Sequence, residues 1–182
     1  MNRRMMLVAA AAVATTGPAF AQNSSAAPPP ASGPAPQLSQ AEQDYINNTA
    51  KIGTASLQMS DIALQKARHP RVKEFARFEH DEQTTMGDVL KSMNPNLKPP
   101  APPQEVAAAI EKLKQLRPGE AFDSEFVTAQ IQGHEALRTT QQGYLKSARN
   151  PEAITAAKLA LAMINEHLAL LSDLRRDRLA RL

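Results

Sequence analysis

Apolar residues recur at helical spacing along most of the chain after residue 38, and no segment there shows the alternation typical of a strand. The pattern predicts four long helices and one short helix, each separated from the next by proline or glycine. The expected bounds are 39–68, 70–93, 104–116, 120–148 and 151–178. The sequence therefore indicates an all-α domain.

The expected arrangement is a ferritin-like, antiparallel four-helix bundle with the short helix in the link between the second and third long helices. The links at 69 and 149–150 are too short to let consecutive helices separate, so those helices would pack as antiparallel neighbours. The proline-rich link at 95–103 is longer and could cross over the bundle, as in ferritin-like folds. Ser39 followed by Glu42 predicts a capping box at the first helix.

The first 37 residues follow another pattern. Arg3 and Arg4 precede an apolar stretch at 5–16, and a small-x-small pattern at 19–21 follows, which is typical of an export signal cleaved after Ala21. The next segment is rich in proline, alanine and serine and is expected to be an extended linker. The expected divisions are 1–21 (signal peptide), 22–37 (disordered linker) and 38–182 (helical bundle domain), with a periplasmic location.

The composition of the chain excludes several kinds of site and partner. The chain has no cysteine, which excludes disulfides, thiolate metal sites and cysteine nucleophiles. Two of its 21 basic residues lie in the signal, which leaves 19 against 18 acidic residues, so no nucleic-acid partner is expected. No uninterrupted apolar run reaches the roughly 18–20 residues that span a bilayer. Self-association into a homo-oligomer stays open.

Arginines gather near the C-terminus. Two interpretations are open: a solvated last helical turn, where cations suit the helix dipole, or weak contact with an anionic membrane surface. The residues concerned are Arg175, Arg176, Arg178 and Arg181.

Polar residues interrupt the apolar stripes of three long helices. Glu79 and Glu82 do so in the second, His134 in the third and His167 in the fourth. Carboxylates and imidazoles on facing helices are how bundle cores build metal sites, and a buried carboxylate needs a partner because its desolvation is costly. The four side chains are candidate ligands for iron or another divalent metal. Alternatively, they bond to one another and set the helix register, with no cofactor.

The chain lacks the Glu-x-x-His pairs of a di-iron oxidase, and near mid-length the first helix offers Ser56 and no acid. The four methionines after residue 38 lie on helical stripes and are expected in the core: Met59, Met86, Met93 and Met163. The last helix is expected to face the core through Ala153, Ala156, Ala160, Met163, Leu170 and Leu174.

The chain resembles the exported bacterial family called domain of unknown function 4142, placed in the ferritin-like superfamily. The matching stretches are 62–67 (IALQKA), 72–79 (VKEFARFE), 82–83 (EQ), 122–123 (FD), 129–134 (AQIQGH) and 166–170 (EHLAL), within about residues 41–175. Glu82, Gln83, His134 and His167 match motif positions. Many members have an acid where this chain has Ser56, and the Asp-His pair of the second helix is replaced around Glu79.

The resemblance implies a ferritin-like bundle in the cell envelope. We expect a periplasmic, non-enzymatic protein that serves binding in the envelope or stress tolerance. The alternative is a ferritin-like metal-binding or redox protein with a carboxylate and histidine site in the bundle core.

Overall fold

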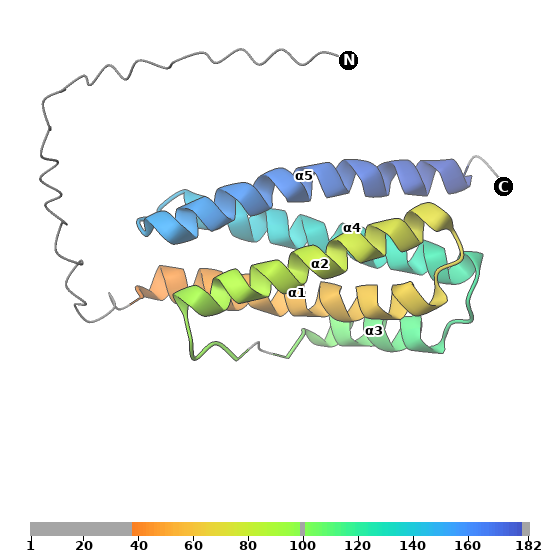
Figure 1. The fold of residues 1–182 in the computed structure, drawn as a ribbon, viewed down its shortest axis with the longest axis horizontal. Helices are drawn as coiled ribbons and strands as arrows, with labels where there is room; N and C mark the ends of the chain where they lie inside the picture. Colours follow the sequence, from red (N-terminus) through yellow and green to blue (C-terminus); the bar gives the residue numbers. More distant parts are fainter. Residues whose placement is uncertain (1–37, 99–100, 180–182) are drawn as a thin grey trace, which may run out of the picture. The chain divides into compact units, whose positions relative to one another are not determined.

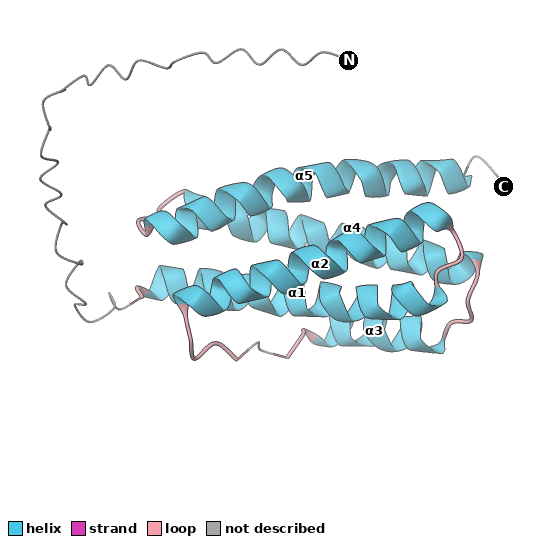
Figure 2. Ribbon diagram, in the orientation of Figure 1, coloured by secondary structure: helices cyan, strands magenta, loops and turns pink. Residues whose placement is uncertain are grey.

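The computed structural model describes residues 38–98 and 101–179, and within these ranges every regular element is a helix (Figure 2). The all-α prediction is confirmed. The elements are α1 (Gln40–Lys66), α2 (Pro70–Met93), α3 (Gln104–Gln115), α4 (Glu120–Leu145) and α5 (Pro151–Leu179). Each lies where the periodicity predicts it. The expected signal peptide at 1–21 and linker at 22–37 lie outside the described residues.

Four long helices run alongside one another, and each is antiparallel to the long helices it packs against (Figure 1). α1 packs on α2 and α4, and α5 packs on α4 and more loosely on α2. The short helix α3 lies outside α1 and α4 and carries the chain back along the length of α2. Because of this return, α4 runs in the same direction as α2.

Local signals fix several helix ends. Glu42 Oε2 accepts the Ser39 N–H at 2.7 Å and the Ser39 hydroxyl accepts the Glu42 N–H, so the predicted capping box is present. Asn150 Oδ1 accepts two backbone N–H groups in the first turn of α5. Gly119 has a φ of 148°, which L side chains rarely adopt, and it separates α3 from α4.

Two buried or partly buried charges join elements that are distant in sequence. The Asp123 carboxylate of α4 accepts the backbone N–H groups of Arg68 and His69 at 3.2 and 2.9 Å, at the turn between α1 and α2. Asp123 is only 3% exposed. These backbone donors precede α2 and have no partner within the helix, so Asp123 holds the turn in place.

Lys66, at the end of α1, binds the C-terminus of α3. Its ammonium group donates to the carbonyl oxygens of Leu113 and Leu116 at 3.1 Å and also to that of Lys114. The last carbonyls of a helix have no intrahelical donor and carry partial negative charge, so this contact stabilises the C-terminus of α3.

The core consists of apolar layers separated by polar side chains. One layer packs Val72 and Phe75 of α2 against Phe122 and Phe126 of α4. The layer at the other end includes Tyr45, Ile46, Leu90, Tyr144 and Ala153. The polar residues buried between the layers are Thr49, Ser56, Ser60, Glu79, Gln83, Gln130, His134, Gln141 and His167.

The face that α5 turns to the core differs in part from the expected stripe. Ala153, Ala156, Ala160 and Leu174 are buried as expected, but Leu170 is 39% exposed and Met163 is only half-buried. Ile164 and Leu171 occupy the core instead. The reason is that α5 carries apolar residues on several faces, so periodicity alone does not single out one of them. The predicted core positions of Met86 and Met93 also need correction, since both are half-buried and pack at the edge of the core.

Because so many of its residues are apolar, α5 is by length and composition able to cross a membrane, over Pro151–Asp177. A third of its most apolar window is buried in the domain. The expectation that no segment passes this test is therefore wrong for α5. A helix in the core of a folded domain passes the same test, and α5 packs along α4.

Candidate metal centre

Side chains from three helices meet in the middle of the domain. Glu79 of α2, His134 of α4 and His167 of α5 are 0%, 1% and 8% exposed. Glu79 Oε2 lies 3.2 Å from His134 Nε2 and 3.2 Å from His167 Nδ1, and the two nitrogens are 3.1 Å apart. Three atoms that ligate metals in proteins thus form a nearly equilateral triangle.

The outer nitrogen of each imidazole has its own acceptor. His134 Nδ1 lies 2.8 Å from the carbonyl oxygen of Gln130, one turn earlier in α4, and because a carbonyl only accepts, this nitrogen carries a proton. His167 Nε2 lies 3.3 Å from Oε2 of Glu82, and this carboxylate favours a proton on Nε2. In the neutral rings, His134 Nε2 and His167 Nδ1 are therefore unprotonated and face Glu79.

The centre of the triangle therefore requires a positive charge. Two nitrogen lone pairs and a carboxylate oxygen face one another at hydrogen-bond distance, and without a proton or cation between them they repel. Glu79 Oε2 is buried and receives no well-directed hydrogen bond, although both imidazoles are in reach. A proton can join only one pair of these atoms at a time, whereas a metal ion can contact all three.

The triangle matches a set of metal ligands in size. Adjacent ligands about 2.0–2.2 Å from one ion lie about 2.8–3.1 Å apart in octahedral geometry and about 3.3–3.6 Å apart in tetrahedral geometry, a span of about 2.8–3.6 Å. The three edges of 3.1–3.2 Å fall in this range. Metal-bound histidines usually donate their other ring nitrogen to a carbonyl or a carboxylate. Here His134 faces a backbone carbonyl and His167 faces a carboxylate.

The second oxygen of Glu79 is held from α1. The Ser56 hydroxyl lies 2.5 Å from Glu79 Oε1 and 2.6 Å from Gln130 Oε1. One hydroxyl has one proton and cannot donate to both, and the ionised carboxylate is the stronger acceptor. With the Gln130 amide turned over, its NH₂ donates to Ser56 and Ser56 donates to Glu79. Four helices thus contribute to orienting this carboxylate.

The surroundings shift the protonation of these groups. Burial opposes ionisation of Glu79, but contacts with His134, His167 and Ser56 outweigh burial and hold the pKa of Glu79 well below its usual range. Burial would lower the pKa of His167, but Glu79 and Glu82 outweigh it and raise that pKa. Burial raises the pKa of Glu82, more than the nearby His167 lowers it. The centre thus favours an ionised Glu79 beside a cation.

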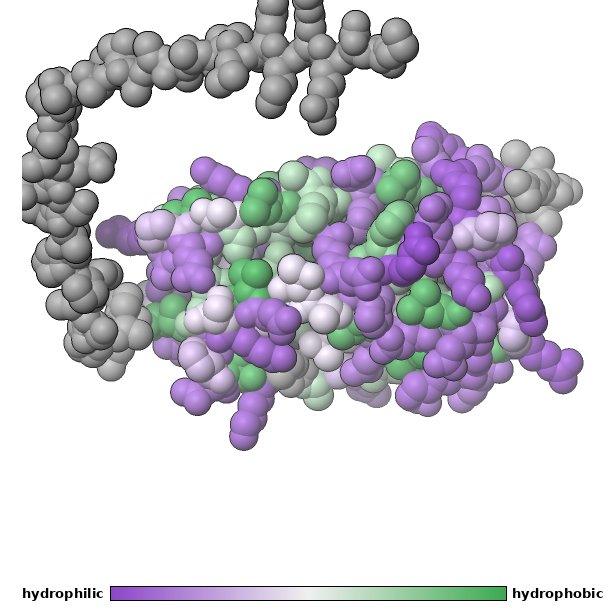
Figure 3. Space-filling view, viewed as in Figure 1, coloured by the Kyte–Doolittle hydropathy of each residue, from purple (hydrophilic) through white to green (hydrophobic). Residues whose placement is uncertain are grey.

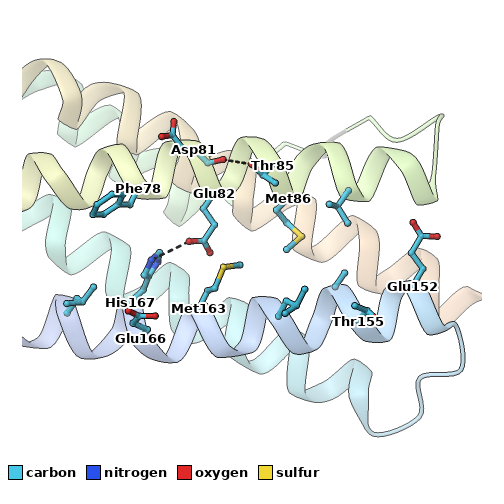
Figure 4. A pocket seen from close by; sticks show the side chains of 14 residues that line it. Phe78, Asp81, Glu82, Thr85, Met86, Glu152, Thr155, Met163, Glu166 and His167 are labelled. Carbon is cyan, nitrogen blue, oxygen red and sulfur yellow. Dashed lines mark hydrogen bonds and ion pairs between the residues drawn. The ribbon is translucent and has the colours of Figure 1, made fainter. Parts of the chain in front are cut away.

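One side of the centre is covered and the other leads outward. The Phe75 ring packs against His134 and His167, with centroids 6.0 and 5.1 Å away. On the opposite side, Glu82 extends from α2 toward His167 at the wall of a groove between α2 and α5 (Figure 4).

All four site residues predicted from the sequence lie close together, but only three of them face the centre. Glu79, His134 and His167 form the triangle, and Glu82 stands behind His167. Ser56 and Phe75 also belong to the site, although the sequence did not predict them there. For Ser56 a signal was present: it occupies the mid-helix position where many members of the family that this chain resembles carry an acid.

Two of the C-terminal arginines, Arg175 and Arg176, are described with their side chains, and neither belongs to this centre. Arg175 and Arg176 are exposed, and Arg176 pairs with Asp173 one turn earlier. The side chain of Arg178 and the whole of Arg181 lie outside the described residues, so contact with a membrane surface stays a prediction.

Comparisons with known proteins concern the family and the fold. The family described as "Domain of unknown function (DUF4142)" matches residues 27–174. No curated protein matches the chain. A DUF305 fragment from Deinococcus radiodurans has a similar structure, with a TM-score of 0.68 and 17% identity over 81% of this chain and 100% of its own.

A DUF305 protein from Streptomyces coelicolor, described as a candidate secreted protein, is similar in the same way. The TM-score is 0.67 and the identity is 15%, over 76% of this chain and 92% of the other. At this identity both likenesses concern the fold alone.

Proposed function

The chain belongs to the DUF4142 family, and we propose that it is a metal-binding protein whose Glu79, His134 and His167 hold one divalent cation. The observation that carries this proposal is the set of three buried atoms of ligand type, two imidazole nitrogens and a carboxylate oxygen, that face one another with edges of 3.1–3.2 Å. Burying these three atoms side by side is costly, because they lose their hydration and repel one another. A bound cation would remove that repulsion.

The donor set favours a particular group of metals. Two imidazoles and one carboxylate suit zinc and ferrous iron, whereas calcium and magnesium prefer oxygen ligands throughout. Three protein ligands also leave a coordination position for water or another small ligand. Glu82 orients His167 from outside, as carboxylates do for metal-bound histidines.

The centre is proposed for one ion and not two. A second ion would need further carboxylates beside Glu79, but the position facing Glu79 from α1 is the neutral hydroxyl of Ser56. Glu82 is directed to the outer nitrogen of His167 and away from the triangle. The proposed role is therefore binding of a single metal, without an assigned reaction.

The proposal includes a ferritin-like four-helix bundle and a location in the cell envelope. Antiparallel packing of α1, α2, α4 and α5, with α3 returning the chain along their length, supports the first. The export-signal pattern before Ala21 and the description of the Streptomyces coelicolor protein as a candidate secreted protein support the second. Fractionation of cells that express the full chain tests the location.

Metal binding is tested on the domain expressed and purified without chelator. Elemental analysis comes first and measures the metal that the protein retains. The metal-free protein is then titrated with Zn²⁺, Fe²⁺, Mn²⁺ and Co²⁺. We expect about one ion per chain and an increase in melting temperature. Co²⁺ adds a spectroscopic signature, because its visible absorption reports coordination number. Glu79→Gln, His134→Ala and His167→Ala are each expected to lose this binding.

His80→Ala is the matched control, because His80 is next to Glu79 in sequence but turns to the surface, where it pairs with Asp61 and Asp81. It is expected to bind metal like the parent protein. If none of the four metals binds or stabilises the parent, the cluster serves only to hold the helices in register, and the proposal is wrong.

A further inference from the structure

A groove separates α2 from α5 on one face of the domain. Its volume is about 980 Å³, and its walls include Phe78, Met86, Leu159 and Met163 (Figure 4). Of the four pairs of adjacent long helices, α2 and α5 make the fewest contacts, so their facing side chains leave space. Pockets that bind small molecules have about 300–1,000 Å³, so this groove is large enough for one.

Exposed apolar surface is concentrated in this groove. Phe78, Leu159 and Leu170 are 51%, 62% and 39% exposed, and they are the large exposed hydrophobic residues among those that the structure describes. All three line the groove. Figure 3 shows apolar side chains over α5 and toward α2, with hydrophilic ones around them. Grouped exposure of this kind marks a contact site more often than scattered exposure does.

The ionisable groups that line the groove are four acids and one histidine. The acids that line it are Asp81, Glu82, Glu152 and Glu166, together with His167, and no lysine or arginine is among the lining residues. Asp81 contacts His80, Glu152 contacts Ser92 and Glu82 contacts His167. Among the described residues Glu166 forms no ion pair with a lysine or arginine, and it interacts electrostatically with His167.

Two of these carboxylates lie beside the apolar surface. Glu82, whose side chain is 18% exposed, extends from α2 into the middle of the groove, and Glu166 comes from α5 next to His167 (Figure 4). Both carboxylates line the same groove beside His167, where like negative charges repel each other. A positive charge placed between them would relieve this repulsion and would leave the rest of its molecule against the methionines and leucines.

We propose that the groove binds an amphiphilic cation, an amine or quaternary ammonium group carried on an apolar body. The ammonium group lies between Glu82 and Glu166, and the apolar body lies along Met86, Leu159 and Met163. Methionine side chains adapt to apolar ligands of different shapes, and the exposed Phe78 ring offers a face to a cation. Glu82 contacts His167 of the metal centre, whereas Glu166 and the apolar wall take no part in that centre, so Glu166 is the residue that separates the two proposals.

The test uses three probes with the same alkyl chain, below their micelle concentrations: dodecyltrimethylammonium, dodecanoate and dodecyl maltoside. Calorimetry measures affinity, and ¹⁵N-resolved NMR of the domain locates the contacts. The cation is expected to bind at least about tenfold more tightly than the anion, since charge-assisted contacts contribute that much. The shifted signals are expected from α2 and α5.

Variants separate charge from apolar contact. Glu166→Gln is expected to weaken binding of the cation about tenfold and to leave the maltoside unchanged. Leu159→Gln is expected to weaken all three probes, and because Leu159 is 62% exposed, this variant is expected to fold. Glu135→Gln, an exposed acid of α4 that does not line the groove, is the matched control.

Zinc titrations of the same samples keep the two proposals apart. Glu166→Gln is expected to bind zinc like the parent, so loss of cation binding with zinc binding intact supports the groove proposal alone. Equal or tighter binding of dodecanoate, no change in Glu166→Gln, or no binding of any probe would each overturn it, whatever the result for zinc.

Discussion

The hydroxyl of Ser56 lies 2.5 Å from Oε1 of Glu79, so a small neutral side chain of α1 holds a buried carboxylate of α2. The carboxylate can then direct its other oxygen, Oε2, toward the two imidazoles. Ser56 thereby controls the orientation of a proposed ligand without contacting the ion.

Ser56→Ala tests this relation. The change leaves Glu79 Oε1 buried without its hydroxyl donor, and we expect zinc affinity to fall about 10- to 100-fold, as when other outer hydrogen bonds of metal ligands are removed. Competition with a chromophoric chelator measures the affinity. Ser60→Ala is the matched control, because Ser60 is equally buried on α1 and its hydroxyl is hydrogen-bonded to the side-chain amide of Gln130, at 3.4 Å, and not to Glu79. An equal loss in both variants would contradict the assigned role.

Asp123→Ala is expected to destabilise the domain by about 1–3 kcal/mol, because two backbone donors at the turn before α2 lose their acceptor. Urea unfolding followed by circular dichroism measures the change. Asp88→Ala alters an exposed acid of α2 and is expected to stay within about 0.5 kcal/mol of the parent. If the two variants unfold alike, Asp123 does not hold the turn.

Lys66→Met removes the ammonium group that binds the last carbonyls of α3 and keeps a similar side-chain length. We expect a loss of about 1 kcal/mol, with faster amide hydrogen exchange concentrated in α3. Exchange that rises equally in every helix would mean that Lys66 stabilises the domain as a whole and not the end of α3. Lys73→Met, at an exposed position of α2, is the control.

Stability of the metal-free domain is expected to fall as pH rises above about 6.5, the ordinary pKa of histidine. The folded-state pKa of His167 is raised, so its contribution is complete below the unfolded value and is lost as pH rises through the folded one. The raised pKa of Glu82 acts in the same direction from about pH 4.3 upward. The lowered pKa of Glu79 contributes above about pH 4.3 and is lost as pH falls.

Urea midpoints between pH 4 and 9, measured in chelator, give this profile, and His167→Gln is expected to flatten its neutral and alkaline part. Saturating zinc is expected to reverse the slope, because zinc binds deprotonated ligands and its stabilisation grows with pH. Parallel profiles with and without zinc would argue that the ion does not bind at these residues.

Local sequence determined the helices of this protein. Proline and glycine positions, the Ser39 and Glu42 capping box and the apolar period placed all five helices, because these signals act within one or two turns of the chain. The stripe interruptions also located the polar layer, since a polar residue on a buried face is visible without knowledge of its partner.

Tertiary packing decided what those residues meet. Glu79 and Glu82 interrupt the same stripe, but only the rotation and offset of α2 against α4 and α5 bring Glu79 into the triangle and leave Glu82 behind His167. Packing also turned Leu170 and Met163 of α5 out of the core and into the groove. Helical periodicity defines a face to within about one residue, whereas a ligand atom must be placed to within about an ångström, and only the neighbouring helices set that position.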